Sequence, residues 1–320
     1  MSGGAMTESI DFRQNSRRIS VVLRNQDQEA PSKNREFPLS SNSFPLEKEF
    51  ADILSELDRM VGLEHVKELV YEIYALLQVE QFRKLEGLLT KPQVYHMVFK
   101  GNPGTGKTTV ARILGKLFKT MGVLKKGHLL EVERADLVGE YIGHTAIKTR
   151  DLIKKAMGGI MFVDEAYSLA RGGEKDFGKE AIDCMVKAME DHREDFVLIL
   201  AGYSEEMDYF LSMNPGLPSR FPIQVDFPDY TVEQLMQIAN LMLQEREYLF
   251  APLSAEKFRI QLAQVKAQEW EGFSNARYIR NLIEKSIRYQ AVRLVRQHMR
   301  SPSKQELMTI RPEDLQFDKI

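Results

Sequence analysis

Residues 101–108 have the composition and spacing of a loop that holds phosphate groups. Their sequence, Gly-Asn-Pro-Gly-Thr-Gly-Lys-Thr, fits the P-loop pattern of a nucleoside triphosphate site. Glycines let the backbone turn sharply and approach phosphate oxygens, while amide N–H groups at a helix start attract the anion. The Lys107 ammonium can reach the β- and γ-phosphates, and the Thr108 hydroxyl can bind Mg²⁺. We predict that the loop contacts the nucleotide through Pro103, Gly104, Thr105, Gly106, Lys107, Thr108 and Thr109.

Two acidic residues, Asp164 and Glu165, directly follow an apolar run at residues 160–163. A strand of the same sheet can bring its end beside the P-loop, so we predict that the Asp164 carboxylate helps to bind Mg²⁺. Glu165 is then placed to polarise a water for attack on the γ-phosphate. The alternative, two acids that end a strand in solvent, is weaker because a P-loop precedes them.

The elements that must position these residues follow from the hydrophobic pattern. An apolar run at 94–99 predicts a strand before the P-loop, and apolar residues spaced three and four apart predict a helix after it. Further strands are predicted at 129–133, 159–163, 197–201 and 223–227, with helices at 145–156 and 178–192 between them. Alternating strands and helices indicate an α/β fold, with a parallel sheet covered by helices on both faces.

Three regions follow one another along the chain. Residues 1–45 are polar and without periodicity, which predicts a disordered N-terminal tail. Residues 46–228 form the predicted α/β domain, which begins with a pair of helices. Residues 229–320 predict a small all-α lid domain with helices at 231–244, 254–265 and 275–298, and no strand is expected after Pro228.

The composition restricts the class of protein. The 320 residues are 43% hydrophobic and carry a formal net charge of −2, which gives no reason to expect a nucleic-acid partner. No stretch is apolar enough for a membrane span, and the first residues do not resemble a secretory signal. The single cysteine suits a reducing compartment. We therefore expect a cytoplasmic protein with no membrane partner.

The order of the motifs resembles that of the AAA+ ATPases, with Gly62, the P-loop, the acidic pair, Arg220 and Arg277 in sequence. Within these, residues 133–145, 164–169 and 214–221 resemble the group that contains stage V sporulation protein K and the red-type rubisco activase. The likeness extends over residues 47–312. Residues 172–180 resemble the sporulation protein more than they resemble the activase. The resemblance implies ATP hydrolysis with Mg²⁺ by a ring, expected to be a hexamer.

The resemblance implies roles for two arginines. Arg220 corresponds to the arginine finger, which reaches the γ-phosphate held by an adjacent subunit of the ring. A guanidinium there neutralises charge that develops in the transition state. Arg277 corresponds to the sensor-2 arginine, which contacts the phosphates from the lid of the same subunit. The alternative for both is an arginine in solvent.

The resemblance also marks three less certain positions. Gly62 is expected to contact the nucleotide. The fourth strand ends in Ala-Gly-Tyr-Ser instead of the Thr-Asn that is frequent in the family, so either Tyr203 or Ser204 could position the attacking water. Tyr141, Ile142 and Gly143 correspond to an aromatic pore loop that grips a protein chain, although Tyr141 could instead pack on the following helix.

The function expected from the sequence is therefore an ATP-driven ring motor that remodels or threads a protein partner in a sporulation-related process. The first alternative is an activase of inhibited red-type rubisco. A small-molecule kinase fits less well, because the adjacent acids favour hydrolysis. A GTP-operated switch lacks the Asn-Lys-x-Asp element, and a DNA-directed motor lacks a basic helix-turn-helix.

Overall fold

The computed structural model describes residues 45–91, 93–141, 143–171, 177–214, 216–267, 273–297 and 301–317. The disordered tail predicted for the N-terminus falls almost entirely on residues 1–44, and these lie outside the described residues. The same holds for Ile142 of the predicted pore loop and for residues 172–176, where the sequence is most similar to the sporulation protein.

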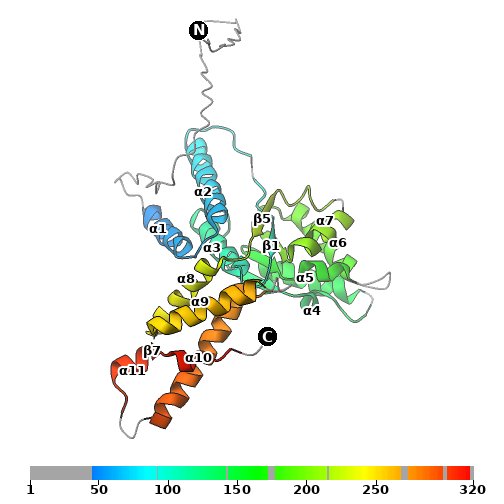
Figure 1. The fold of residues 1–320 in the computed structure, drawn as a ribbon. Helices are drawn as coiled ribbons and strands as arrows, with labels where there is room; N and C mark the ends of the chain where they lie inside the picture. The colour runs from blue at the N-terminus through cyan, green and yellow to red at the C-terminus, as the bar shows by residue number, and fades with distance from the viewer. Residues whose placement is uncertain are drawn as a thin grey trace, which may run out of the picture. The chain divides into compact units, whose positions relative to one another are not determined.

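A parallel five-stranded sheet organises the α/β part of the chain (Figure 1). The strand order is β2-β3-β4-β1-β5, and every neighbouring pair is parallel. The register pairs Val163 with Leu200 and Leu200 with Val98, so β3 and β1 end at the same edge on either side of β4. The strands are β1 Met97–Gly101, β2 Leu129–Val132, β3 Ile160–Val163, β4 Val197–Gly202 and β5 Ile223–Phe227.

Helices cover both faces of this sheet, as the alternating pattern predicts. Successive strand residues point to opposite faces, so Phe99 belongs to one buried cluster and Val98 to the other. The Phe99 face packs against α1 (Pro45–Asp58), α2 (Glu64–Leu85) and α3 (Lys107–Thr120). The Val98 face packs against α4 (Arg134–Leu137), α5 (His144–Ala156), η1 (Ala166–Ala170), α6 (Gly178–Asp191) and α7 (Ser204–Met213).

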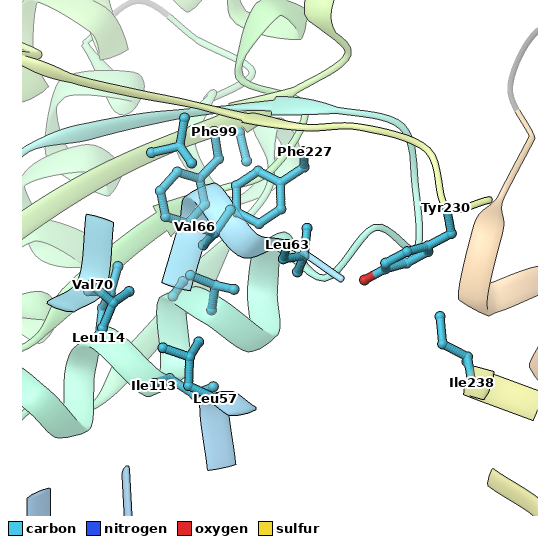
Figure 2. Packing of buried hydrophobic residues seen from close by; sticks show 14 of the residues in the cluster. Leu57, Leu63, Val66, Val70, Phe99, Ile113, Leu114, Phe227, Tyr230 and Ile238 are labelled. Atoms are coloured by element: carbon cyan, nitrogen blue, oxygen red, sulfur yellow. The ribbon is translucent and has the colours of Figure 1, made fainter. Parts of the chain in front are cut away.

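Figure 2 shows the cluster on the Phe99 face from close by. The rings of Phe99 and Phe227, on neighbouring strands, are 4.9 Å apart between centroids. Val70 of α2 and Leu114 of α3 belong to the same cluster, and all four side chains are buried. Burying one such side chain stabilises the fold by about 1.5–3 kcal/mol. The cluster continues to Tyr230, directly after β5, and so joins the sheet to the C-terminal helices.

The C-terminal part contains the three predicted helices, now seen as α8 (Val232–Gln244), α9 (Pro252–Ala267) and α10 (Asn275–Gln297). It also contains α11 (Lys304–Met308), η2 (Pro312–Asp314) and two short parallel strands, β6 (Leu249–Phe250) and β7 (Thr309–Ile310). The expectation that no strand follows Pro228 is therefore wrong. Two-residue strands are too short to show an alternating pattern, which is why the sequence does not reveal them.

The predicted element boundaries agree with the structure to within a few residues. The largest shift is in the first strand, which the apolar run placed at 94–99 and which spans Met97–Gly101. Tyr95 and His96 are buried although they precede the strand, so the apolar run extends beyond the hydrogen-bonded ladder. In the ranges that the structure describes, no helix combines the length and apolar character needed to cross a membrane.

Candidate active site

A cavity of about 840 Å³ lies where the P-loop, the end of β3 and the C-terminal helices meet. Its size suits a nucleotide-sized ligand. Residues 59–61, between α1 and α2, form part of the wall, and α8 and α10 form another part. Ten of the predicted site residues line it: Pro103, Gly104, Gly106, Lys107, Thr108, Thr109, Asp164, Glu165, Tyr203 and Arg277.

The backbone of the P-loop has the geometry that phosphate binding needs. Gly104 and Gly106 have φ angles of 71° and 103°, in the left-handed region that favours glycine. A Cβ on Gly106 would lie 2.9 Å from Cε of Met60, a contact that a shift of this flexible side chain would relieve, so the backbone conformation is the stronger reason for glycine here. Helix α3 begins at Lys107, directly after the loop, and its unpaired N–H groups and dipole favour an anion there.

Lys107 is held inside the P-loop by main-chain carbonyls. Its Nζ donates hydrogen bonds to the carbonyl oxygens of Gly101, at 2.7 Å, and Asn102, at 2.8 Å. Burial lowers the pKa of the ammonium, and the nearby Asp164 carboxylate opposes that shift. A buried cation favours a multivalent anion as partner, so phosphate oxygens suit this position.

The two acids after β3 also line the cavity. The Asp164 N–H donates to the Val132 carbonyl at 3.0 Å, which continues the ladder between β3 and β2. Asp164 Oδ1 accepts a hydrogen bond from the Glu165 N–H at 3.0 Å. Glu165 itself has φ 46° and ψ 44°, a left-handed conformation that is uncommon for a glutamate. Oxygen ligands from Asp164 and Thr108 fit a site for Mg²⁺.

The start of α10 packs directly on the P-loop. The Ala276 N–H donates to the Gly104 carbonyl at 3.2 Å. Arg277, the next residue, lines the cavity, and so does Arg280. Arg280 is not among the site residues predicted from the sequence, although a spacing of three places it on the same helix face as Arg277. With Arg246, which follows α8, the cavity thus has three arginines from the C-terminal part of the chain.

Three other predicted site residues do not line the cavity. Arg220 is outside this cavity, where its Nε donates to Glu190 Oε1 at 3.0 Å and a guanidinium nitrogen donates to the Gly216 carbonyl at 2.8 Å. Gly62 does not line the cavity either, and a Cβ there would lie 2.6 Å from Nε2 of Gln234. Thr105 is fully buried, and its hydroxyl donates to the Asn102 carbonyl at 2.7 Å.

The remaining candidates lie at loop ends. Tyr203 lines the cavity, with its ring 5.9 Å from that of Tyr167, whereas Ser204 begins α7 and does not line it. Tyr141 is 65% exposed, and its ring makes an edge contact with His144 at 5.4 Å. Gly143 has φ 81° and open space around it. The tyrosine is therefore largely exposed, and its ring contacts the first residue of α5, the helix that follows.

Sequence reasoning missed the short connection between β5 and α8. Its Tyr230 lines the cavity and donates from its hydroxyl to the Thr105 carbonyl at 2.9 Å. Burial raises the pKa of this hydroxyl to about 12, so it stays protonated. The signal in the sequence was weak, because Pro-Asp-Tyr before a helix is typical of an ordinary connection.

Comparisons with known proteins agree with this geometry. Residues 97–229 match the family model described as ATPase family associated with various cellular activities (AAA), and residues 231–319 match the AAA lid domain. Stage V sporulation protein K of Bacillus subtilis (strain 168) is 61% identical over 267 residues, which cover 82% of each chain. The chain belongs to the AAA+ ATPases. As a member of this family it hydrolyses ATP.

Other AAA+ relatives extend the comparison. The chloroplastic ribulose bisphosphate carboxylase/oxygenase activase of Cyanidioschyzon merolae is 46% identical over 266 residues, covering 82% of this chain and 90% of the activase. Among solved structures, a variant of Thermotoga maritima RuvB has a TM-score of 0.52 at 18% identity, over 81% of this chain and 69% of that one. At that identity the likeness concerns the fold alone.

Proposed function

We propose that this AAA+ ATPase is the subunit of a ring, a hexamer, that uses ATP to remodel or thread a protein partner in a sporulation-related process. The position of Arg220 carries the proposal. Lys107, Asp164 and Arg277 line the chain's own cavity, whereas Arg220 lies outside it, bound to Glu190. An arginine finger that serves a neighbouring subunit would be found in this kind of position.

Within one subunit, the residues of the cavity have different roles in the binding and hydrolysis of ATP. The P-loop N–H groups and Lys107 bind and orient the phosphates. Thr108 and Asp164 would hold Mg²⁺, which when bound neutralises charge on the β- and γ-phosphate oxygens. Glu165, beside Asp164, takes a proton from the attacking water. Tyr203 lies where it could orient that water, which favours it over Ser204 as sensor 1.

Between subunits, Arg220 would complete the neighbour's site. A guanidinium at the γ-phosphate stabilises the transition state, and such residues change kcat by about 10³–10⁵ in other phosphoryl-transfer proteins. An interface in which one patch contacts a different patch of the next copy closes into a ring when the rotation allows it. Arg220 must exchange its Glu190 partner for phosphate as the subunits associate.

Mixing experiments test the ring. We expect Arg220→Ala and Lys107→Ala subunits, each inactive alone, to recover ATPase activity when they are mixed, because the Arg220 of a Lys107→Ala subunit completes the intact P-loop site of an Arg220→Ala neighbour. Arg193→Ala is a matched control, since it removes an exposed arginine only three residues from Glu190. A mixture that stays inactive although both variants fold would refute the proposal, as would a fully active monomer.

A substrate trap addresses the protein partner. Glu165→Gln should bind ATP, hydrolyse it slowly and retain the partner that the exposed Tyr141 contacts. Loss of retention in Glu165→Gln carrying Tyr141→Ala as well, with the ring intact, would support a pore-loop role. The activase alternative is separated by incubating inhibited red-type rubisco with the protein and ATP. Recovery of carboxylation would favour the activase over the sporulation-related role.

We also propose the domain organisation and the location that the sequence predicts. We assign residues 46–228 to the α/β ATPase domain and residues 229–320 to the lid, in agreement with family matches that meet at residues 229 and 231. A cytoplasmic location, without a membrane or nucleic-acid partner, follows from the near-neutral charge and the single cysteine. Fractionation of the native host would test the location.

A further inference from the structure

Asp229 lies between the P-loop and the lid and bonds to both. It follows β5 in the connection that leads to α8. Its two carboxylate oxygens accept hydrogen bonds from Nδ2 of Asn102, the second P-loop residue, each at 3.0 Å. Its Oδ1 also accepts a hydrogen bond from Nδ2 of Asn275, the first residue of α10, at 2.7 Å. One carboxylate therefore joins the two parts of the chain that carry Lys107 and Arg277.

Asn275 is held firmly at the lid end of this link. It is fully buried and has φ 44°, a left-handed conformation that asparagine tolerates better than most residues. Its Oδ1 accepts from the Tyr230 N–H at 3.0 Å, and its Nδ2 also donates to the Phe273 carbonyl at 3.1 Å. These bonds fix the first turn of α10, and Arg277 is only two residues further along the helix.

Asn102 connects the other end of the link to Lys107. Its side chain donates to Asp229, while its carbonyl accepts from Lys107 Nζ at 2.8 Å. The charge on Asp229 also reaches Lys107, because it opposes the lowering of the lysine's pKa by burial. A shift of Asn102 therefore changes the position of the Lys107 ammonium.

We propose that Asp229 is a positioning residue, which holds Asn102 and Asn275 in one geometry so that Lys107 and Arg277 meet the same phosphates. This inference rests on the proposed roles of Lys107 and Arg277. Asp229 does not line the cavity, so it acts through these two cations and touches no reacting atom. Its effect should be on turnover more than on folding, because its own side chain is exposed.

The substitution Asp229→Asn tests this proposal. It keeps the size of the side chain but removes the charge and leaves a single acceptor oxygen for two N–H donors. We expect kcat for ATP to fall about tenfold, the scale of losing one hydrogen bond to a charged group. The affinity for ADP should change less than about threefold, since the carbonyl partners of Lys107 remain in place. Asp208→Asn is the matched control, because Asp208 is an exposed carboxylate that pairs with Lys100 without contacting the lid.

A double-mutant cycle with Arg277→Ala separates positioning from a merely structural role. If Asp229 acts through Arg277 as well as through Lys107, adding Asp229→Asn to Arg277→Ala lowers kcat by clearly less than the tenfold expected in the wild-type background, because only the part that acts through Lys107 remains. Additive losses, an unchanged kcat in Asp229→Asn, or an equal loss in Asp208→Asn would each overturn the inference. An unchanged kcat in Arg277→Ala alone would instead refute the proposed role of Arg277, and with it the route by which Asp229 acts. Thermal melting of every variant shows whether folding is retained.

Discussion

Replacing Gly104 by alanine should destabilise the protein by forcing α10 away from the P-loop, even with no nucleotide bound. Gly104 has φ 71°, which costs a residue with a Cβ about 1–2 kcal/mol. A Cβ at this position would also lie 2.8 Å from the Arg277 nitrogen and closer still to the Ser274 carbonyl oxygen. Both atoms belong to the backbone at the start of α10, so no side-chain rotation relieves the contact.

The size of the effect follows from these contacts. Moving the helix start lengthens the hydrogen bond from the Ala276 N–H to the Gly104 carbonyl, worth about 1 kcal/mol. Overpacking against a rigid backbone adds about 1–3 kcal/mol. We therefore expect Gly104→Ala to lower the free energy of unfolding by about 3–6 kcal/mol. Gly122, with φ 74° and nothing within 4 Å of an added Cβ, supplies the matched control.

Urea denaturation of both variants, followed by circular dichroism without nucleotide, measures the difference. Gly122→Ala should lose only about 1–2 kcal/mol, the cost of the backbone conformation. The excess loss in Gly104→Ala then reports the contact between the P-loop and the lid. Equal losses in the two variants would refute the reasoning, because they would mean that α10 accommodates a methyl group without cost.

Three other measurements test the packing around the site. Burial lowers the pKa of His96 to about 4, so as the pH falls below about 6.5 a proton binds at this residue in the unfolded chain but not in the folded protein. The free energy of unfolding should therefore drop by about 3 kcal/mol between pH 7 and pH 4, and His96→Asn should lessen that drop. Asp314→Asn breaks the buried ion pair in which the Arg293 guanidinium donates to the two Asp314 oxygens at 2.7 Å and 2.9 Å. Urea denaturation should show a free energy of unfolding lower by about 3–5 kcal/mol, and a loss below about 1 kcal/mol would contradict this expectation. Tyr230→Phe removes the buried bond to the Thr105 carbonyl, and a lower Tm is expected, equivalent to about 1 kcal/mol.

The sequence predicts the sheet and the phosphate side of the cavity well, because both depend on local patterns. A strand, a glycine-rich turn and a helix follow one another without interruption around Lys107, so its position is determined by neighbours in the chain. Asp164 is also predictable, since it ends a buried strand and parallel strands end at one edge. The roles of these residues remain predictions until they are tested.

The contacts between the P-loop and the lid are not predictable in the same way. Asp229 and Asn102 are far apart in the chain, and neither has a neighbour pattern that indicates their hydrogen bonds. Asn275 could be recognised from sequence only as a helix-start residue, whereas its amide bonds depend on the folded arrangement. The exclusion of Arg220 from the cavity likewise depends on where α6 ends, because its partner Glu190 belongs to that helix.

The left-handed backbone at Glu165 has a consequence for the relation between stability and activity. A glutamate in this conformation is less stable by about 1–2 kcal/mol than it would be in an ordinary one, whereas asparagine adopts it more readily. Glu165→Asn is therefore expected to make the folded protein more resistant to heat while removing the carboxylate next to Asp164. With the role proposed above for Glu165, screens that select for thermostability alone would favour inactive variants at this position. Under that proposal the ATPase keeps a less stable residue at the place where its chemistry occurs.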